Sequence, residues 1–284
     1  MRSFSKVFAL SLLTAAFLAG SAQARTVKGC VIKHHTTCHH KELHGQDLHG
    51  ENLHHANLHH ADLHGVSLHH AVLHHVNLHH ANLRGADLHG ADLREADLHG
   101  ADLQGANLKG AKLHRYTAPK KKGANTSATP GCSPNCQGAN LYGANLIYAD
   151  MSYANLAAAT LTNARLMYAN LTGSAVSNST LTNANASYAN LNYATVSWAA
   201  LNGTNLSYAN IIRSNMTGSN LSGANLSYAN LTGATLSSGN MTNAIMVNAT
   251  VNGTVMDGMF GWGGAIGCGS VYPAGALDGR GCAN

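Results

Sequence analysis

The sequence predicts an all-β solenoid in which the chain turns a corner every five residues. Leucine recurs at every fifth position from Leu43 to Leu113, and a second run with the same period extends from Leu141 to Met256. A period of five matches neither the 3.6-residue period of a helix nor the two-residue alternation of a strand. Regular internal repetition is typical of solenoids, in which each repeat buries its apolar side chains against neighbouring repeats.

The units share more than leucine. The residue two before the central position is usually Ala, and the residue just before it is usually Asn or Asp, as in 91–95 (ADLRE) and 101–105 (ADLQG). In the second run Met, Val, Ile or Ala sometimes replaces the central Leu. We expect the Leu and Ala side chains to face inward and the other three positions to face solvent.

A second period, of 20 residues, indicates four units in each coil. Two series of residues carry it: Tyr148, Tyr168, Tyr188, Tyr208 and Tyr228, and Gly45, Gly65, Gly85 and Gly105. If one coil takes 20 residues, the members of each series form a column with a spacing of about 4.8 Å, the distance between neighbouring strands.

The A-(N/D)-L-x-x pattern resembles the pentapeptide-repeat family, and the resemblance covers nearly all of 41–257. It implies a right-handed quadrilateral β-helix with four units per coil, here in two blocks of about four and about six coils. Some members of that family mimic DNA and bind DNA gyrase, which requires a cytoplasmic location and an acidic surface. The leader described next and the basic charge balance argue against that role.

The first 24 residues have the pattern of a secretory signal peptide. Arg2 and Lys6 are positively charged, the stretch 7–19 is apolar, and 22–24 (AQA) fits a small-x-small cleavage site. We therefore expect cleavage after Ala24, a periplasmic or secreted mature chain, and no membrane-integral segment after cleavage.

The mature chain divides by composition into five segments. They are a Cys/His-rich N-terminal cap (25–40), a His-rich solenoid (41–115), a break (116–137), an Asn/Ser/Thr/Tyr-rich solenoid (138–257) and a Gly-rich C-terminal cap (258–284). The break is either a linker between two solenoids or a loop from one coaxial solenoid, and the sequence leaves both open.

The six cysteines form three local pairs: Cys30 with Cys38, Cys132 with Cys136, and Cys268 with Cys282. Because an exported chain meets an oxidising compartment, we expect disulfides, with the pairing inferred from proximity alone.

The distribution of histidine is the feature of the sequence that most strongly indicates a function. All 20 histidines lie between His34 and His114, and most follow the central Leu at the two outward positions. With 20 residues per coil they form columns, and neutral imidazole is a common ligand of Zn, Cu, Ni and Co ions. The predicted metal ligands are His49, His54, His55, His59, His60, His69, His74, His75, His79, His80, His89 and His99. Asp62, Asp87, Asp97 and Glu95 are nearby carboxylates that can support them.

Close packing of imidazoles has a further consequence. Like charges at this spacing disfavour protonation, so we expect the His-rich solenoid to lose stability below about pH 6.5.

The sequence contains no catalytic or cofactor-binding motif. The serine-rich second run has no histidine to act as a base, and there is no phosphate loop. The formal net charge of +5 is too small to indicate nucleic-acid binding, and two of the positive charges, Arg2 and Lys6, lie in the leader.

Two hypotheses for function follow. The first is an exported, non-enzymatic binding protein that takes up transition-metal ions without requiring any cofactor. The second is a structural or interaction protein for adhesion, envelope association or self-assembly, including homo-oligomers. The column Tyr148, Tyr168, Tyr188, Tyr208 and Tyr228 offers either a surface for a protein or glycan partner or rings that pack on one another to stabilise the coils.

Overall fold

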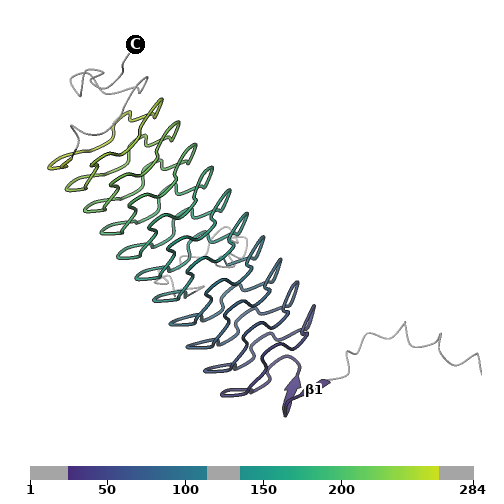
Figure 1. Ribbon diagram of the computed structural model, residues 1–284. Helices are drawn as coiled ribbons and strands as arrows, with labels where there is room; N and C mark the ends of the chain where they lie inside the picture. The colour runs from purple at the N-terminus through teal and green to yellow at the C-terminus, as the bar shows by residue number, and fades with distance from the viewer. Residues whose placement is uncertain (1–24, 114–134, 262–284) are drawn as a thin grey trace, which may run out of the picture.

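The computed structural model describes residues 25–113 and 135–261, which form a stack of coils running from the N-terminal to the C-terminal end (Figure 1). Two short strands, β1 (Arg25–Val27) and β2 (Cys30–Ile32), pair as an antiparallel hairpin. From Thr37 onward the described chain pairs through isolated parallel bridges, and it contains no helix.

On either side of the break each bridge joins a residue to the one 20 positions later, and a bridge occurs at every fifth residue, so one coil has four sides. The backbone hydrogen bonds show how this works. The Leu78 N–H donates to the Asp97 carbonyl of the next coil at 2.7 Å, and the Asn77 N–H donates to the Ala56 carbonyl of the previous coil at 2.9 Å. Each coil is therefore bonded to the coils on both sides.

The two leucine runs belong to one stack. Across the break the bridge offset changes from 20 to 38 residues, as in Asp97↔Asn135 and Lys112↔Asp150, and the Leu98 N–H donates to the Asn135 carbonyl at 2.8 Å. The coil that contains Asn135 thus lies directly on the coil that contains Asp97. Residues 114–134 connect two consecutive coils of a coaxial solenoid.

The coils extend beyond the solenoid boundaries that the leucine repeat predicted. Thr37 already bridges to Asn57, and Asn135 is bridged although the break was expected to run to residue 137. In both units a cysteine, Cys38 or Cys136, occupies the buried central position. A search for leucine misses these units for that reason.

The core is a continuous column of the central Leu and preceding Ala side chains, most of them 0–1% exposed. Six described units carry a buried Ser or Thr in the Ala position, and in the five units that follow the break these hydroxyls bond to core carbonyls. For example, Ser174 Oγ donates to the Leu171 carbonyl at 2.8 Å, and Thr204 Oγ1 donates to the Leu181 carbonyl at 2.7 Å. A buried hydroxyl is tolerated when it has such a partner.

Each corner is a turn that starts at the central Leu. The Leu53 carbonyl accepts a hydrogen bond from the Ala56 N–H at 2.9 Å, and the residue between them, His55, has a φ of 56°. A positive φ at this place is characteristic of a type II turn and favours Gly or Asn. Many units do carry Gly there, whereas others carry His, Asn or Tyr.

The preference for Asn or Asp before the central residue has a local cause. The Asn57 Oδ1 accepts a hydrogen bond from the His59 N–H at 3.2 Å, and the same bond recurs in many other units. These side chains brace the start of each turn, which is the usual reason for Asn and Asp near turns.

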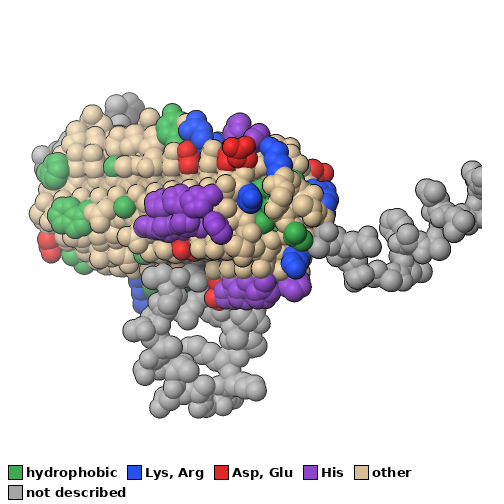
Figure 2. Space-filling model, turned by 90° about the horizontal axis from the view of Figure 1, so that it is seen from below, with side chains coloured by type: hydrophobic (Ala, Val, Ile, Leu, Met, Phe, Trp, Pro, Cys, Tyr) green, Lys and Arg blue, Asp and Glu red, His purple; other side chains and the backbone are tan. Residues whose placement is uncertain are grey.

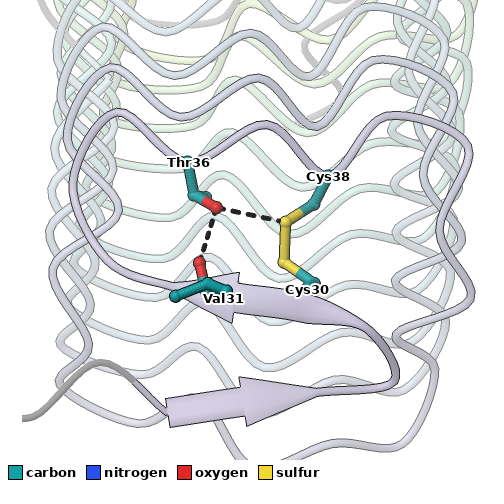
Figure 3. Close-up of a disulfide and its surroundings, with 4 residues drawn as sticks. All are labelled: Cys30, Val31, Thr36 and Cys38. Carbon is teal, nitrogen blue, oxygen red and sulfur yellow. Dashed lines mark hydrogen bonds between the residues drawn. A yellow bond between two sulfur atoms is a disulfide. The ribbon is translucent and has the colours of Figure 1, made fainter.

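The hairpin β1–β2 packs against the first coil (Figure 3). A disulfide joins Cys30 to Cys38 with a Cα–Cα distance of 5.5 Å, and Thr36 Oγ1 donates to the Val31 carbonyl at 2.5 Å. The hairpin buries Val27 and Ile32 with the core. It thus protects backbone groups at this end that are otherwise free to pair with another chain.

Several sequence predictions lie outside the described residues. These are the signal peptide, Cys132, His114, most of the Gly-rich C-terminal segment, and the pair Cys268 and Cys282. In residues 25–113 and 135–261 the structure has no helix able to span a membrane.

The prediction that Cys136 forms a disulfide is wrong, because its thiol is free and fully buried at the central position of a coil unit. This burial raises the pKa of the thiol to about 12. We predict that the thiol resists alkylation at pH 8 in the native protein and becomes reactive on unfolding, because only the thiolate is the nucleophile. Mass spectrometry after iodoacetamide labelling, with and without denaturant, measures this. Rapid labelling of Cys136 in the native protein would contradict the buried position of its thiol.

Candidate metal centre

The square coil sorts the described histidines onto its four edges, where they gather in separate patches (Figure 2). Edge A carries His34, His35, His54, His55, His74 and His75. Edge B carries His39, His40, His59, His60, His79, His80 and His99. Edge C carries His49, His69, His70 and His89, and edge D carries His44 and His64.

Edge A brings imidazoles from successive coils into contact. His54 Nε2 lies 3.1 Å from His74 Nδ1, and the rings of His55 and His75 stack at 4.6 Å with an interplanar angle of 1°. His54, His55 and His75 each offer one ligand atom, and these atoms lie within 4.8 Å of one another. Three nitrogens from two successive coils therefore lie close together on the surface.

A carboxylate completes a second group on the same edge. His74, His75 and Glu95 also offer ligand atoms within 4.8 Å, and Glu95 Oε2 lies 3.5 Å from His75 Nδ1. The Nε2 atom of His74 is buried and has no hydrogen-bond partner among the described residues. Glu95 can either bind an ion with these histidines or orient the His75 ring, as carboxylates behind zinc-bound histidines commonly do.

The geometry of edge A suits an open ion site. Ligand nitrogens that share a zinc ion at 2.0–2.1 Å lie roughly 3.4 Å apart in tetrahedral geometry, so small side-chain rotations bring the three imidazoles together. His55 is exposed, and His54 and His75 are half-buried. An ion can therefore reach the site from solvent and keep water as a remaining ligand.

Burial and neighbouring imidazoles disfavour the charged form of three edge A histidines. The pKa of His54, His55 and His74 is lowered, first by desolvation and then by nearby histidines. Asp92 and Glu95 oppose this effect at His74 but do not reverse it. Neutral imidazole is the form that binds metal ions, so this environment favours ligation at neutral pH.

Edge B is a stacked array rather than a cluster. Its rings lie one coil apart, with centroid distances of 5.1 Å between His59 and His79 and 5.0 Å between His79 and His99. The Nδ1 atoms of His79 and His99 are buried without a hydrogen-bond partner among the described residues. An unpartnered Nδ1 leaves the ring without the second contact that usually orients a metal-binding histidine.

On edge C the rings of His49 and His69 stack at 3.6 Å, but ring nitrogens of this edge bond to backbone carbonyls. His49 Nδ1 bonds to the His69 carbonyl and His89 Nδ1 to the Lys109 carbonyl, both at 2.8 Å. On edge D, His44 Nδ1 lies 3.5 Å from Asp62 Oδ2. No group of three ligand atoms within 4.8 Å of one another occurs on these edges in the part of the chain that the structure describes.

Of the twelve predicted ligands, the structure brings together His54, His55, His74 and His75. The other eight lie on edges without such a group: His49, His59, His60, His69, His79, His80, His89 and His99. Glu95, predicted as a supporting carboxylate, lies close enough to be a ligand. It occupies the same turn position as His75, with a φ of 59°, and this 20-residue spacing is the signal that indicates its place in the column.

The five tyrosines of the 20-residue series form a ladder at the corner of successive coils. Their ring centroids are 5.0, 4.9, 4.9 and 4.7 Å apart, and the interplanar angles do not exceed 15°. The rings pack on one another, as cross-strand aromatic pairs do.

Most of the chain matches a known repeat family. The family model for pentapeptide repeats matches eight copies, and the matched residues span 42–110 and 134–258. No curated protein matches the chain significantly.

Three solved structures are similar to parts of the chain. HetL from the cyanobacterium Nostoc, a pentapeptide repeat protein involved in heterocyst differentiation regulation, is 31% identical, with 86% of this chain and 92% of HetL covered and a TM-score of 0.30. A pentapeptide repeat protein from the Arabidopsis thaliana thylakoid lumen is 25% identical over 42% of this chain and 66% of its own, with a TM-score of 0.28. The fluoroquinolone resistance protein QnrB1 is 17% identical over 66% of this chain and 87% of its own, with a TM-score of 0.27. The matched repeats span most of the sequence, and the chain therefore belongs to the pentapeptide-repeat family.

Proposed function

We propose that this pentapeptide-repeat protein is an exported, non-enzymatic binding protein that takes up transition-metal ions on edge A. The observation that carries the proposal is the convergence of His54, His55 and His75 from successive coils, with ligand atoms within 4.8 Å. Pentapeptide-repeat proteins are generally non-enzymatic structural or binding proteins, which is consistent with a binding role. The leader in residues 1–24 supports export.

The donor set indicates the class of ion. Imidazole nitrogens with one carboxylate suit Zn, Cu, Ni and Co, whereas Mg and Ca prefer sites made of oxygen. An exposed site made of a few side chains binds with modest selectivity, so we expect Cu(II) to bind most tightly, as in the Irving–Williams order. We further infer a right-handed coil with four sides, as in other members of the family.

Isothermal titration of the untagged mature protein with Zn(II), Ni(II) and Cu(II) tests the proposal. We expect micromolar binding that weakens at least tenfold when His54, His55 and His75 are replaced by Asn. Asn is a suitable replacement because Asn163 and Asn183 occupy the same positive-φ turn position as His55 and His75. Glu95→Gln is expected to weaken binding by roughly tenfold, the usual effect of losing a carboxylate that supports a metal-bound histidine.

The matched control removes the same number of imidazoles from edge B, with His59, His60 and His79 replaced by Asn. This variant should keep the micromolar sites. Equal losses in both variants would mean that binding depends on histidine content and not on edge A. Only millimolar binding by the wild-type chain would favour the alternative, a structural or interaction protein.

A further inference from the structure

The tyrosine ladder presents a row of phenol groups that the candidate metal centre does not use. It continues edge C into the C-terminal coils, because the bridges Asp92↔Lys112 and Lys112↔Asp150 place its first rung next to Gly110 on the following coil. Each inner rung has a tyrosine ring on both sides, and each end rung has one. The rungs are Tyr148, Tyr168, Tyr188, Tyr208 and Tyr228.

Neighbouring rings of the ladder are close enough to react with one another. Their centroids lie 4.7–5.0 Å apart, with interplanar angles of 2–15°. The χ2 torsion of tyrosine is broad, so a ring can turn about its own axis without leaving the column. When two neighbours turn in this way, an ortho carbon of one ring points at an ortho carbon of the other. Two rings joined by a single carbon–carbon bond have centroids only slightly closer than those of the ladder.

The ladder differs from the other exposed tyrosines in its contacts and not in its accessibility. Its rings are 45–58% exposed, and Tyr153 and Tyr193 are 60% and 57% exposed. At the same turn position of the next coil, Tyr153 is followed by Gly173 and Tyr193 by Arg213. Among residues 135–261, ring stacking between tyrosines occurs only within the ladder. The chain therefore offers both paired and isolated phenols that an oxidant in solution can reach.

We propose that the ladder is an oxidative cross-linking site, at which tyrosines of successive coils are joined as dityrosine. The oxidant is hydrogen peroxide, used by a peroxidase. Each of two neighbouring phenols loses one electron and one proton, and the two radicals join through their ortho carbons. The ring hydrogens on these carbons then move to the oxygens, which restores both aromatic rings and both hydroxyls. The two electrons and two protons reduce one peroxide to two waters.

Cross-linking of the ladder reinforces the C-terminal coils. Each dityrosine bond joins residues 20 positions apart and closes a covalent ring in the chain. A covalent ring stabilises a fold mainly by restricting the unfolded chain, as a disulfide does. Residues 135–261 contain no disulfide, so this bond supplies a link of a kind that these coils otherwise lack. The proposal is independent of the metal site, because no edge A ligand takes part in it.

Treatment of dilute protein with hydrogen peroxide and a peroxidase tests the site, with chelator present to keep metal ions off edge A. We expect dityrosine fluorescence in the monomer, and tryptic peptides joined with the loss of two hydrogen atoms. Trypsin cuts after Arg165 and Arg213, so a bond between Tyr208 and Tyr228 joins the peptides 166–213 and 214–280. Tandem mass spectrometry identifies the joined residues.

Two matched variants separate the ladder from the other tyrosines. Replacing Tyr168 and Tyr208 by Phe keeps a ring on every rung but leaves the remaining phenols two coils apart, about 9.6 Å at the strand spacing. This variant should lose nearly all dityrosine in the monomer. The control replaces Tyr153 and Tyr193 by Phe, which removes the same number of phenols outside the ladder. It should form as much dityrosine as the wild type.

Thermal melts confirm that both variants fold. Equal dityrosine yields from the two variants would overturn the proposal, because the ladder would then have no special part in the reaction. Dityrosine confined to covalent dimers would overturn it as well. So would a wild-type protein that forms no dityrosine under conditions that convert free tyrosine to dityrosine.

Discussion

Replacing Leu78 by Ala is expected to lower the free energy of unfolding by about 2–5 kcal/mol, the usual cost of truncating a buried leucine. Leu78 is 0% exposed and stands between Leu58 and Leu98 in one column of the core. Coils in a solenoid contact only their neighbours, so the cavity weakens two inter-coil interfaces at once. The backbone bonds of each coil limit how far the walls can close around it.

Urea denaturation followed by circular dichroism measures this loss. Arg84→Ala is the control, because Arg84 lies on the surface of the same block and forms only an exposed ion pair with Asp102 at 3.3 Å. Its effect should stay below about 1 kcal/mol. A Leu78→Ala protein as stable as the Arg84→Ala protein would contradict the buried leucine column.

Acidic pH is expected to destabilise the coils that carry histidines and to leave the stability of the other coils unchanged. On edge B the pKa of His59, His60 and His79 is lowered, first by desolvation and then by neighbouring histidines. Asp97 opposes the shift at His79 without reversing it. The folded chain therefore binds fewer protons than the unfolded chain below about pH 6.5, and stability present above that pH falls as the pH drops through it.

Hydrogen exchange at pH 7.5 and 5.0, corrected for intrinsic rates and measured with chelator present, locates the effect. Amides of 36–113 should lose protection at pH 5.0, while those of 135–261, a region without histidine, should keep it. Replacing His59, His60 and His79 by Asn should reduce the loss around edge B. Equal loss in both regions would refute an origin in histidine titration.

Much of the architecture could be predicted from the sequence, because the repeat is regular and each repeat contacts only its neighbours. Leu at every fifth position implies that the chain turns regularly and places one apolar side chain of each unit in a common core. The 20-residue series that begins at Tyr148 implies that residues 20 positions apart lie on successive coils. The ring distances near 4.9 Å agree with the expected column. The offset of 38 residues across the break was not predictable, because the pairing of Asp97 with Asn135 depends on three-dimensional contact and not on a repeated pattern.

The candidate site was predicted only in part. Column membership follows from spacing, so His55, His75 and Glu95 could be placed on one edge. Which edge forms a cluster could not be predicted, because edges A and B have similar sequences and differ in side-chain rotation and in Glu95. Cys136 was missed as a core residue, because a cysteine in the leucine position looks like part of the break.

The most direct test of the ligand cluster is a crystal structure of the zinc-loaded protein with anomalous data at the zinc edge. The account predicts a zinc peak among the imidazoles of His54, His55 and His75, side chains contributed by successive coils. Zinc bound to single, separate histidines, with no peak on edge A, would contradict it.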